Sequence, residues 1–138
     1  MNLCKRKQKI FKNLPFFIMT SFNWYYWRME KLDIHIVGLG NLGSAFINGL
    51  MSFEDINLFL YDDSASARQS TQDQFSIVAD DSITFIQSGV IILCIKPQNI
   101  NDFFNNNKDK ISSDVLICSP VAGLEIRTIE SFVSNKII

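Results

Sequence analysis

Short apolar runs alternate with longer amphipathic stretches from residue 33 to residue 138. The short runs are rich in Ile, Val, Leu and Phe and are bounded by polar or turn residues, which is typical of β-strands. Five runs fit this description, at residues 34–37, 56–61, 75–79, 90–95 and 115–118. The run at residues 90–95 is unbroken, which indicates a central parallel strand covered on both faces. Residues 136–138 resemble the start of a sixth strand.

The intervening stretches carry helical spacing or a capping pattern. The first predicted helix has Asn41 as its N-cap and places Leu42, Phe46, Gly49 and Leu50 on one face. Further helices are expected at residues 64–74, 82–87, 100–108 and 126–133. This alternation, without an internal repeat, predicts an α/β fold with a doubly wound parallel sheet of the Rossmann-like type. The sheet is expected to be truncated at about the sixth strand.

A glycine-rich turn joins the first predicted strand to the first helix. Gly38, Gly40 and Gly43 follow the spacing of a dinucleotide-binding loop, and the strand-turn-helix context is the one that this motif requires. In such a loop Gly38 permits the tight turn, Gly40 lets the backbone approach a pyrophosphate, and Gly43 allows close helix packing. The helix N-terminus would then face the phosphates. The motif alone is weak evidence, so the rest of the site must support it.

Three other segments are expected at the same edge of the sheet, where ligands bind in doubly wound folds. Asp62 ends the second predicted strand, roughly 20 residues after the glycine loop, where a carboxylate normally binds the adenosine ribose. It could instead start a turn or cap the next helix. Lys96 opens the sequence Lys-Pro-Gln after the fourth strand, either as a ligand for the cofactor or substrate or as a solvated surface group. Residues 119–123 form the third segment.

Composition narrows the class of protein. The 138 residues suffice for one domain, and 47% hydrophobic residues with a net charge of −1 indicate a globular core without a field that would attract nucleic acid. Cys94 and Cys118 lie in apolar strands and Cys4 lies near the N-terminus, so neither a disulfide framework nor a metal site is expected. His35 is expected to be a packed strand residue. These features are compatible with a reducing cytoplasm, where we expect the protein to be located.

Residues 1–28 differ from the remainder of the chain. A basic cluster at residues 5–12 precedes an aromatic stretch at residues 14–27. Pro15 and Asn23 interrupt that stretch, and a membrane span would need about 20 apolar residues. We therefore interpret residues 1–28 as an extension that is disordered or precedes the native start at Met29, and residues 29–138 as the NAD(P)-binding domain. A membrane-surface anchor is the alternative.

Three sequences together resemble the pyrroline-5-carboxylate reductase family. They are the run from Ile36 to Ala45 around the glycine loop, Ile-Lys-Pro-Gln at residues 95–98, and Ser-Pro-Val-Ala-Gly at residues 119–123. The resemblance covers residues 33–138, which correspond to the N-terminal dinucleotide-binding domain of that family. It implies a nicotinamide cofactor and reduction of the cyclic imine pyrroline-5-carboxylate to proline, the last step of proline biosynthesis.

The resemblance also implies where the cofactor would lie. It places the pyrophosphate near Gly38, Gly40, Asn41, Leu42 and Gly43. It places the nicotinamide ribose near Lys96 and Pro97, and the nicotinamide near Ala122 and Gly123. Asp62 and Asp63 stand where the family often has residues suited to a 2′-phosphate, so the sequence favours NAD slightly over NADP.

Two main hypotheses follow for function, beside a third in which the chain is another Rossmann-type imine or β-hydroxyacid dehydrogenase. The first is an NAD(P)H-dependent oxidoreductase of this reductase type, whose catalytic residues the sequence does not identify. The second is a truncated, catalytically incomplete NAD(P)-binding module, because the family's helical dimerisation and substrate domain has no counterpart after Ile138. In that case an imine would bind only if the missing domain were supplied. An unfinished sheet edge would also favour self-association.

Overall fold

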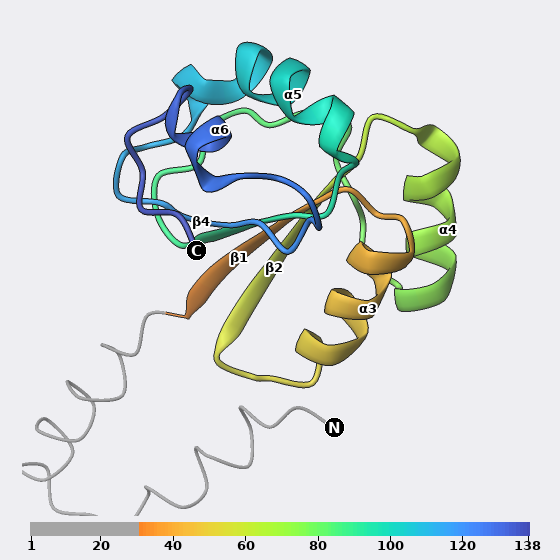
Figure 1. Cartoon of the computed structure of the whole chain (residues 1–138). Coiled ribbons are helices and arrows are strands. Elements are labelled where there is room, and N and C mark those ends of the chain that lie inside the picture. The colour runs from red at the N-terminus through yellow and green to blue at the C-terminus, as the bar shows by residue number, and fades with distance from the viewer. Residues whose placement is uncertain (1–30) are drawn as a thin grey trace, which may run out of the picture. The chain divides into compact units, whose positions relative to one another are not determined.

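Four parallel strands form the sheet, in the order β2-β1-β3-β4 (Figure 1). The strands are β1 (Leu32–Val37), β2 (Ile56–Tyr61), β3 (Val90–Leu93) and β4 (Leu116–Cys118). The strand order reverses between β1 and β3, since β2 extends the sheet to one side of β1 and β4 extends it to the other. Such a switch point is where ligands bind in open α/β sheets.

The computed structural model describes residues 31–138, and Lys31–Ile138 forms one compact unit. The predictions for residues 1–28 lie outside the described residues. Within residues 31–138 no helix is both long and apolar enough to cross a bilayer.

Helices cover both faces of the sheet (Figure 1). On one side lie α3 (Asn41–Leu50) and α4 (Ala65–Phe75). On the other lie α5 (Ile100–Asn107) and α6 (Ile126–Glu130), with the short 3-10 turns η1 (Pro97–Asn99) and η2 (Lys108–Lys110) flanking α5. The predicted doubly wound, Rossmann-like fold is confirmed.

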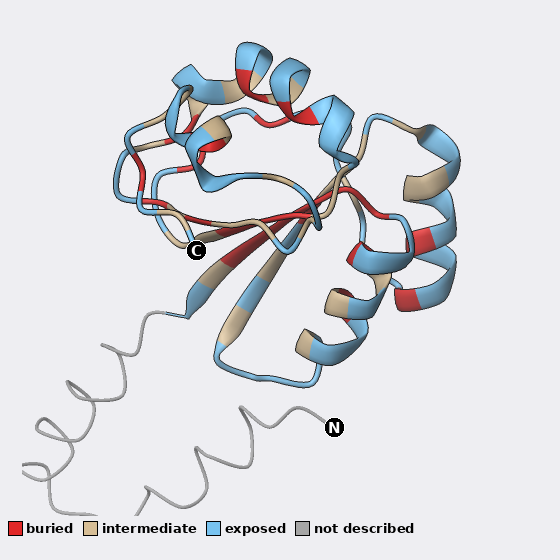
Figure 2. Ribbon diagram, in the orientation of Figure 1, coloured by how far each residue is buried: buried red, intermediate tan, exposed pale blue. Residues whose placement is uncertain are grey.

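Successive side chains along each strand point to opposite faces of the sheet and belong to two apolar clusters, one on each face. Ile91 and Leu93 of β3 pack with Phe104 of α5, whereas Ile92 of β3 packs with Ile36 of β1 and Ile47 of α3. Figure 2 shows this burial along the central strands and on the sheet-facing side of α5. β3 is thus covered on both faces, as its unbroken apolar run predicted.

Two predicted elements are wrong. Residues 75–79 do not form a strand, because Phe75 still belongs to α4 and Ser76 ends that helix with φ +58°. Only Asp80 pairs with β2, through a single parallel bridge to Tyr61. Residues 82–87 do not form a helix: they are irregular chain, in which Ile86 makes a parallel bridge to Ile111.

Two smaller corrections concern α3. The N-cap of α3 is Gly40, and Asn41 is its first helical residue. The buried face of α3 is formed by Gly43 and Ile47, while Leu42 and Gly49 are exposed. Four positions separate Gly43 from Ile47, so they stack on the side that faces the sheet.

The C-terminal residues pair with the outer edge of β4, at a position that the sequence predicted as the start of another strand. Ile137 makes one parallel bridge to Ile117. The backbone N–H of Ser119 also donates to the carbonyl of Ile138 at 2.9 Å. β4 itself begins at Leu116, one residue later than predicted.

Candidate dinucleotide-binding site

The glycine loop begins with a turn that only glycine fits. Gly38 has φ +94°, and a Cβ at this position would lie 2.7 Å from the carbonyl oxygen of Cys94. Its N–H donates to the carbonyl of Tyr61 at 2.9 Å, which ties the loop to the end of β2. A Cβ on Gly43 would overlap the carbonyl oxygen of Gly38. Both glycines therefore hold α3 close against the end of β1.

Gly40 differs from these two glycines. Its backbone is in the extended region with φ −72°, and no other atom lies within 4 Å of the position that a Cβ would take. Open space over a helix N-cap is what close approach of a pyrophosphate to the backbone requires. The surroundings of Gly40 therefore leave room for a pyrophosphate, as expected for the middle glycine of a dinucleotide-binding loop.

The N-terminus of α3 is free to receive an anion. Gly40 supplies no side-chain cap, and the first turn contains no acidic residue. The first N–H groups of a helix have no partner within the helix, and they carry its positive dipole end. Asn41 and Leu42, which contribute these groups, are exposed, and Leu42 keeps 41% of its surface accessible. The arrangement is suited to binding phosphate.

Asp62 lies at the end of β2 and contacts the glycine loop directly. Its Oδ2 accepts a hydrogen bond from the backbone N–H of Leu39 at 2.7 Å, and its Oδ1 accepts one from the N–H of Ser64 at 2.9 Å. The carboxylate thus holds the loop and the entry to α4 in fixed positions. Ser64, not Asp62, is the side-chain cap of α4. The other alternative role does describe the structure, because the bond from the Ser64 N–H to Oδ1 of Asp62, two residues earlier, is a side-chain turn.

Arg68 folds back over the loop that follows β2. One guanidinium nitrogen donates to the carbonyl oxygens of Asp62 at 2.7 Å and Asp63 at 3.0 Å. The cation is therefore held beside the residue expected at the adenosine ribose. The sequence singled out Asp62 but gave no signal for the amide of Leu39 as its partner, because that contact depends on how the loop turns.

The two other predicted segments follow β3 and β4. Lys96 is exposed and precedes η1, and its carbonyl accepts from the N–H of Asn99 at 2.9 Å; Pro97, at the start of η1, is also exposed. Ala122 and Gly123 are exposed in the turn after β4, and Gly123 has φ +79°. All predicted site residues thus follow carboxyl ends of strands β1, β2, β3 and β4.

One buried hydroxyl near this edge was not predicted individually. The Oγ of Ser119, directly after β4, is buried and has no hydrogen-bond partner among the described residues. Buried polar groups are nearly always paired, so this atom is available to a partner outside residues 31–138.

The titratable groups in the sheet carry no evident catalytic chemistry. Burial raises the pKa of the Cys94 thiol to about 11 and also raises the pKa of Cys118, which keeps both thiols protonated and poorly reactive. His35 packs against Phe59, and its Nδ1 lies 3.2 Å from the Tyr61 hydroxyl. Across residues 31–138 no cluster of three His, Cys, Asp or Glu side chains could hold a metal ion.

Comparison with known proteins places the chain in a family. The model of the family described as "NADP oxidoreductase coenzyme F420-dependent" matches residues 33–123, more than half of the chain. The chain belongs to this family. The matched range starts in β1 and ends at Gly123, so it includes the glycine loop, Asp62, Lys96 and the turn after β4.

A curated relative supports the resemblance that the motifs indicated. The chain is similar to a pyrroline-5-carboxylate reductase of Methanosarcina acetivorans, with 28% identity over 107 residues. The match covers 74% of this chain and 40% of the relative. The chain therefore spans about two fifths of the length of that protein, and the resemblance to this reductase family is confirmed for its dinucleotide-binding part.

Solved structures agree on the fold. The chain is similar to 1-pyrroline-5-carboxylate reductase of Streptococcus pyogenes, with TM-score 0.60 and 24% identity over 75% of this chain and 39% of that one. It is also similar to prephenate dehydrogenase of A. aeolicus, solved with hydroxyphenyl propionate and NAD+, with TM-score 0.66, 18% identity and coverage of 77% and 40%. The shared part is the dinucleotide-binding oxidoreductase fold.

Proposed function

We propose that this chain binds a nicotinamide dinucleotide at the glycine loop and serves an NAD(P)H-dependent reduction of pyrroline-5-carboxylate to proline. The observation that carries the binding proposal is the open backbone at Gly40, at the N-terminus of an uncapped helix. The similarity to the reductase of Methanosarcina acetivorans supports the choice of reaction.

Each segment has a proposed task in holding the cofactor. Gly40, Asn41 and Leu42 offer backbone N–H groups to the pyrophosphate, while Gly38 and Gly43 keep α3 close enough for that contact. Asp62 accepts from the adenosine ribose. Lys96, Pro97, Ala122 and Gly123 flank the nicotinamide half. When bound, the nicotinamide supplies the hydride, and the protein supplies orientation.

The choice between the two cofactors depends on the loop after β2. The negative charge of the Asp62 carboxylate would repel a 2′-phosphate. The carboxylate is also held in place, because its two oxygens accept hydrogen bonds from the N–H groups of Leu39 and Ser64. Arg68 partly offsets this charge, but its guanidinium is engaged with two carbonyls of the same loop. We therefore propose NAD as the preferred cofactor.

The second candidate is a dinucleotide-binding module that does not turn over alone. It is favoured because the exposed residues after β3 and β4, Lys96, Pro97, Ala122 and Gly123, include no acid–base pair and no group set to hold an imine. Hydride transfer requires the acceptor about 3 to 3.5 Å from the donor carbon. In this proposal the imine-binding groups come from a helical domain that also dimerises.

One experiment separates the candidates. NADH and NADPH are titrated into the full chain by fluorescence, and absorbance at 340 nm is then followed with pyrroline-5-carboxylate added. Binding with imine-dependent oxidation supports the reductase. Binding without oxidation supports the module, and failure to bind either nucleotide contradicts the site itself. Tighter binding of NADPH than of NADH would contradict the preference proposed from Asp62.

A further inference from the structure

Every backbone and side-chain polar group of Asp62 has a hydrogen-bond partner. Its N–H donates to the carbonyl of Asp80 at 3.1 Å, and its carbonyl accepts from a guanidinium nitrogen of Arg68 at 2.7 Å. Its two carboxylate oxygens accept from the N–H groups of Leu39 and Ser64. Of these four partners only Arg68 acts through its side chain. It is therefore the partner that a substitution can remove.

The guanidinium of Arg68 fixes the direction in which the chain leaves β2. The same nitrogen donates to the carbonyl of Asp62 at 2.7 Å and to that of Asp63 at 3.0 Å. Because the peptide group is planar, holding a carbonyl restricts the ψ angle of the residue that carries it. The ψ angle of Asp62 and its bonded N–H together determine where its Cα–Cβ bond points, and therefore where the carboxylate lies.

Arg68 reaches this loop from a backbone that is itself held in place. It lies in the first turn of α4, and its N–H donates to the carbonyl of Ser64 at 3.1 Å. The Ser64 hydroxyl caps the same helix, and Arg68 is half-buried. The guanidinium is thus held between the helix and the two carbonyls.

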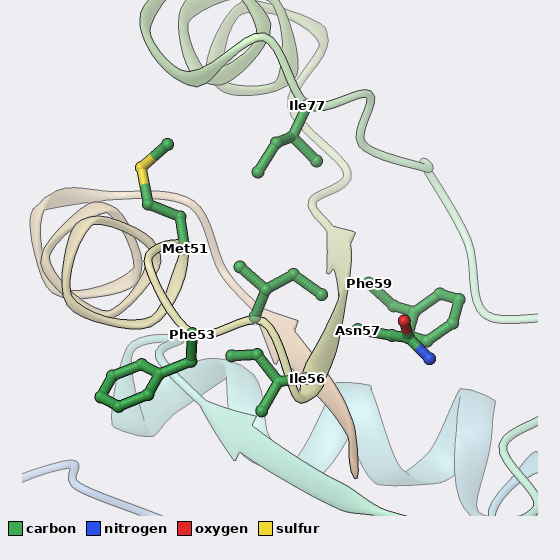
Figure 3. A pocket seen from close by; sticks show the side chains of 7 residues that line it. Met51, Phe53, Ile56, Asn57, Phe59 and Ile77 are labelled. Carbon is green, nitrogen blue, oxygen red and sulfur yellow. The ribbon is translucent and has the colours of Figure 1, made fainter. Parts of the chain in front are cut away.

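Apolar packing does not set the conformation of the loop. An apolar hollow of about 590 Å³ lies beside β2, and Figure 3 shows Met51 and Ile77 pointing into it. Along β2 its lining ends at Phe59, before the loop at residues 62–64 begins. Within the described part of the chain, neither apolar cluster includes a residue of this loop. Hydrogen bonds therefore determine its shape.

A 2′-phosphate is at a disadvantage in this arrangement. The adenosine ribose is proposed to lie at Asp62, so a phosphate on its 2′ oxygen would approach the carboxylate as well as the guanidinium. Turning Arg68 toward the phosphate would leave two carbonyls without their donor, which costs free energy. The cofactor that needs no cation at this position, NADH, avoids that cost.

We propose that Arg68 is a positioning residue that selects the cofactor without contacting it. By holding the carbonyls of Asp62 and Asp63, it fixes the Asp62 carboxylate where it can bond to Leu39 and accept from the adenosine ribose, and so favours NADH over NADPH. This inference rests on the proposed binding of a nicotinamide dinucleotide at the glycine loop.

The first test needs no ligand. Amide hydrogen exchange of the full chain is measured by NMR for the natural chain and for Arg68→Met, which removes every donor and keeps a similar helix propensity. The Leu39 N–H, bonded to Asp62, should exchange about tenfold faster in the variant, as expected when one hydrogen bond weakens. The Gly38 N–H, bonded to Tyr61 instead, is the internal reference.

The second test measures cofactor choice. Fluorescence titrations give the dissociation constants of NADH and NADPH for the same two proteins. Arg68→Met should weaken NADH binding about tenfold and NADPH binding less, so the preference for NADH falls. A phosphate-binding role would shift the preference in the opposite direction, because loss of the cation would weaken NADPH more.

Two further variants serve as controls. Arg68→Lys keeps a cationic N–H donor and should restore at least part of the slow Leu39 exchange and of the NADH preference. Arg127→Met removes the same charge from an exposed position on α6, on the other side of the sheet, and should change neither. Circular dichroism and thermal unfolding verify that each variant is folded.

Each outcome decides. Unchanged Leu39 exchange in Arg68→Met overturns the positioning role. Faster exchange with an unchanged preference overturns the link to cofactor choice, and a larger loss for NADPH than for NADH assigns Arg68 to the phosphate instead. Equal effects in Arg127→Met would contradict a role specific to Arg68. A natural chain that binds neither nucleotide contradicts the proposed function and with it the selection role, while Leu39 exchange still shows whether Arg68 positions Asp62.

Discussion

At the scale of single residues, the three loop glycines are needed for different physical reasons. Gly38 is required by its backbone angle and by the neighbouring Cys94 carbonyl, and Gly43 by contact with the preceding turn. Gly40 meets neither constraint, since its angles suit any residue and its surroundings are open. A ligand is therefore the explanation that remains for glycine at this position, and that can be tested without disturbing the fold.

Gly40→Val should weaken NADH binding at least tenfold and leave the fold intact, because the new side chain would occupy the space proposed for the pyrophosphate. Its cost to stability should be about 1 kcal/mol or less, since the N-cap is already extended. Fluorescence titration and circular dichroism provide the measurements. Gly49→Ala is the control and should bind NADH normally, because Gly49 is exposed and no other group lies within 4 Å of the position that its Cβ would take. Unchanged affinity in Gly40→Val would refute the role of Gly40.

His35 provides a second residue-scale prediction, about pH. It is the only histidine in the chain and is 6% exposed. Burial lowers its pKa below the ordinary 6.5, although Asp33 nearby opposes the shift. The unfolded chain therefore takes up a proton at this residue more readily than the folded protein does. The stabilisation is fully present above pH 6.5 and is lost as pH falls toward and through the folded-state pKa.

Urea unfolding at pH 7.5 and pH 5.5 checks this prediction. The free energy of unfolding should be lower at pH 5.5 in the natural chain, and the difference should shrink in His35→Gln, which stays neutral and can still bond to the Tyr61 hydroxyl. An undiminished pH dependence in His35→Gln would assign the effect to carboxylates instead.

At the scale of elements, the sequence predicted the regular parts well where burial on both faces or helical spacing was unambiguous. β2 matches its predicted range, and α5 lies within the predicted helix at residues 100–108. Residues 82–87 were misassigned because Asp80-Asp81-Ser82 looks like a helix cap and the spacing of Ile83 and Ile86 fits a helix. Irregular chain that buries both isoleucines satisfies the same pattern, and the bridge from Ile86 to Ile111 holds it in place.

The candidate site was predictable to a different degree. Strand order and polarity bring the segments after each strand to one edge, so these segments could be named from the sequence, whereas the cofactor roles of Pro97, Ala122 and Gly123 came from the family resemblance. Individual hydrogen bonds could not be predicted in this way. The bond from the Leu39 N–H to Asp62 depends on the loop conformation, and whether the Ser119 hydroxyl finds a partner depends on side-chain packing. Periodicity carries no information about either.

Phe104 tests the element-scale packing of α5. It is fully buried, stacks on Phe132 with ring centroids 5.5 Å apart and meets Phe103 edge-on. Phe104→Ala should lower the free energy of unfolding by about 3–5 kcal/mol, because it leaves a cavity under the helix. Phe85→Ala, at a mostly exposed phenylalanine, should change it by less than about 1 kcal/mol. Similar losses in both variants would contradict this account of the core.

At the scale of the whole molecule, the surface beside β2 combines a free strand edge with exposed apolar side chains. Met51, Phe53 and Val78 are exposed there, and no charged residue occurs within β2. Such an edge promotes association between chains unless charge or another strand protects it. The expected self-association, first inferred for the C-terminal edge, is therefore also expected at β2.

Phe53→Lys should reduce this association. Phe53 is 62% exposed, so a lysine there adds charge beside the edge with little effect on folding. Light scattering over a concentration series should show a smaller apparent mass than for the natural chain. Asn48→Lys on exposed α3 adds the same charge elsewhere and should leave the apparent mass unchanged. Natural chain that stays monomeric at high concentration would contradict the prediction.

The bond between Leu39 and Asp62 also has a kinetic consequence. Together with the bond from Gly38 to Tyr61, it fixes the first turn of the glycine loop before any ligand arrives. A dinucleotide then meets a loop that needs no rearrangement, and binding without a conformational change is not slowed by a preceding step. Capture of the phosphates should accordingly be a fast event whose rate rises linearly with ligand concentration.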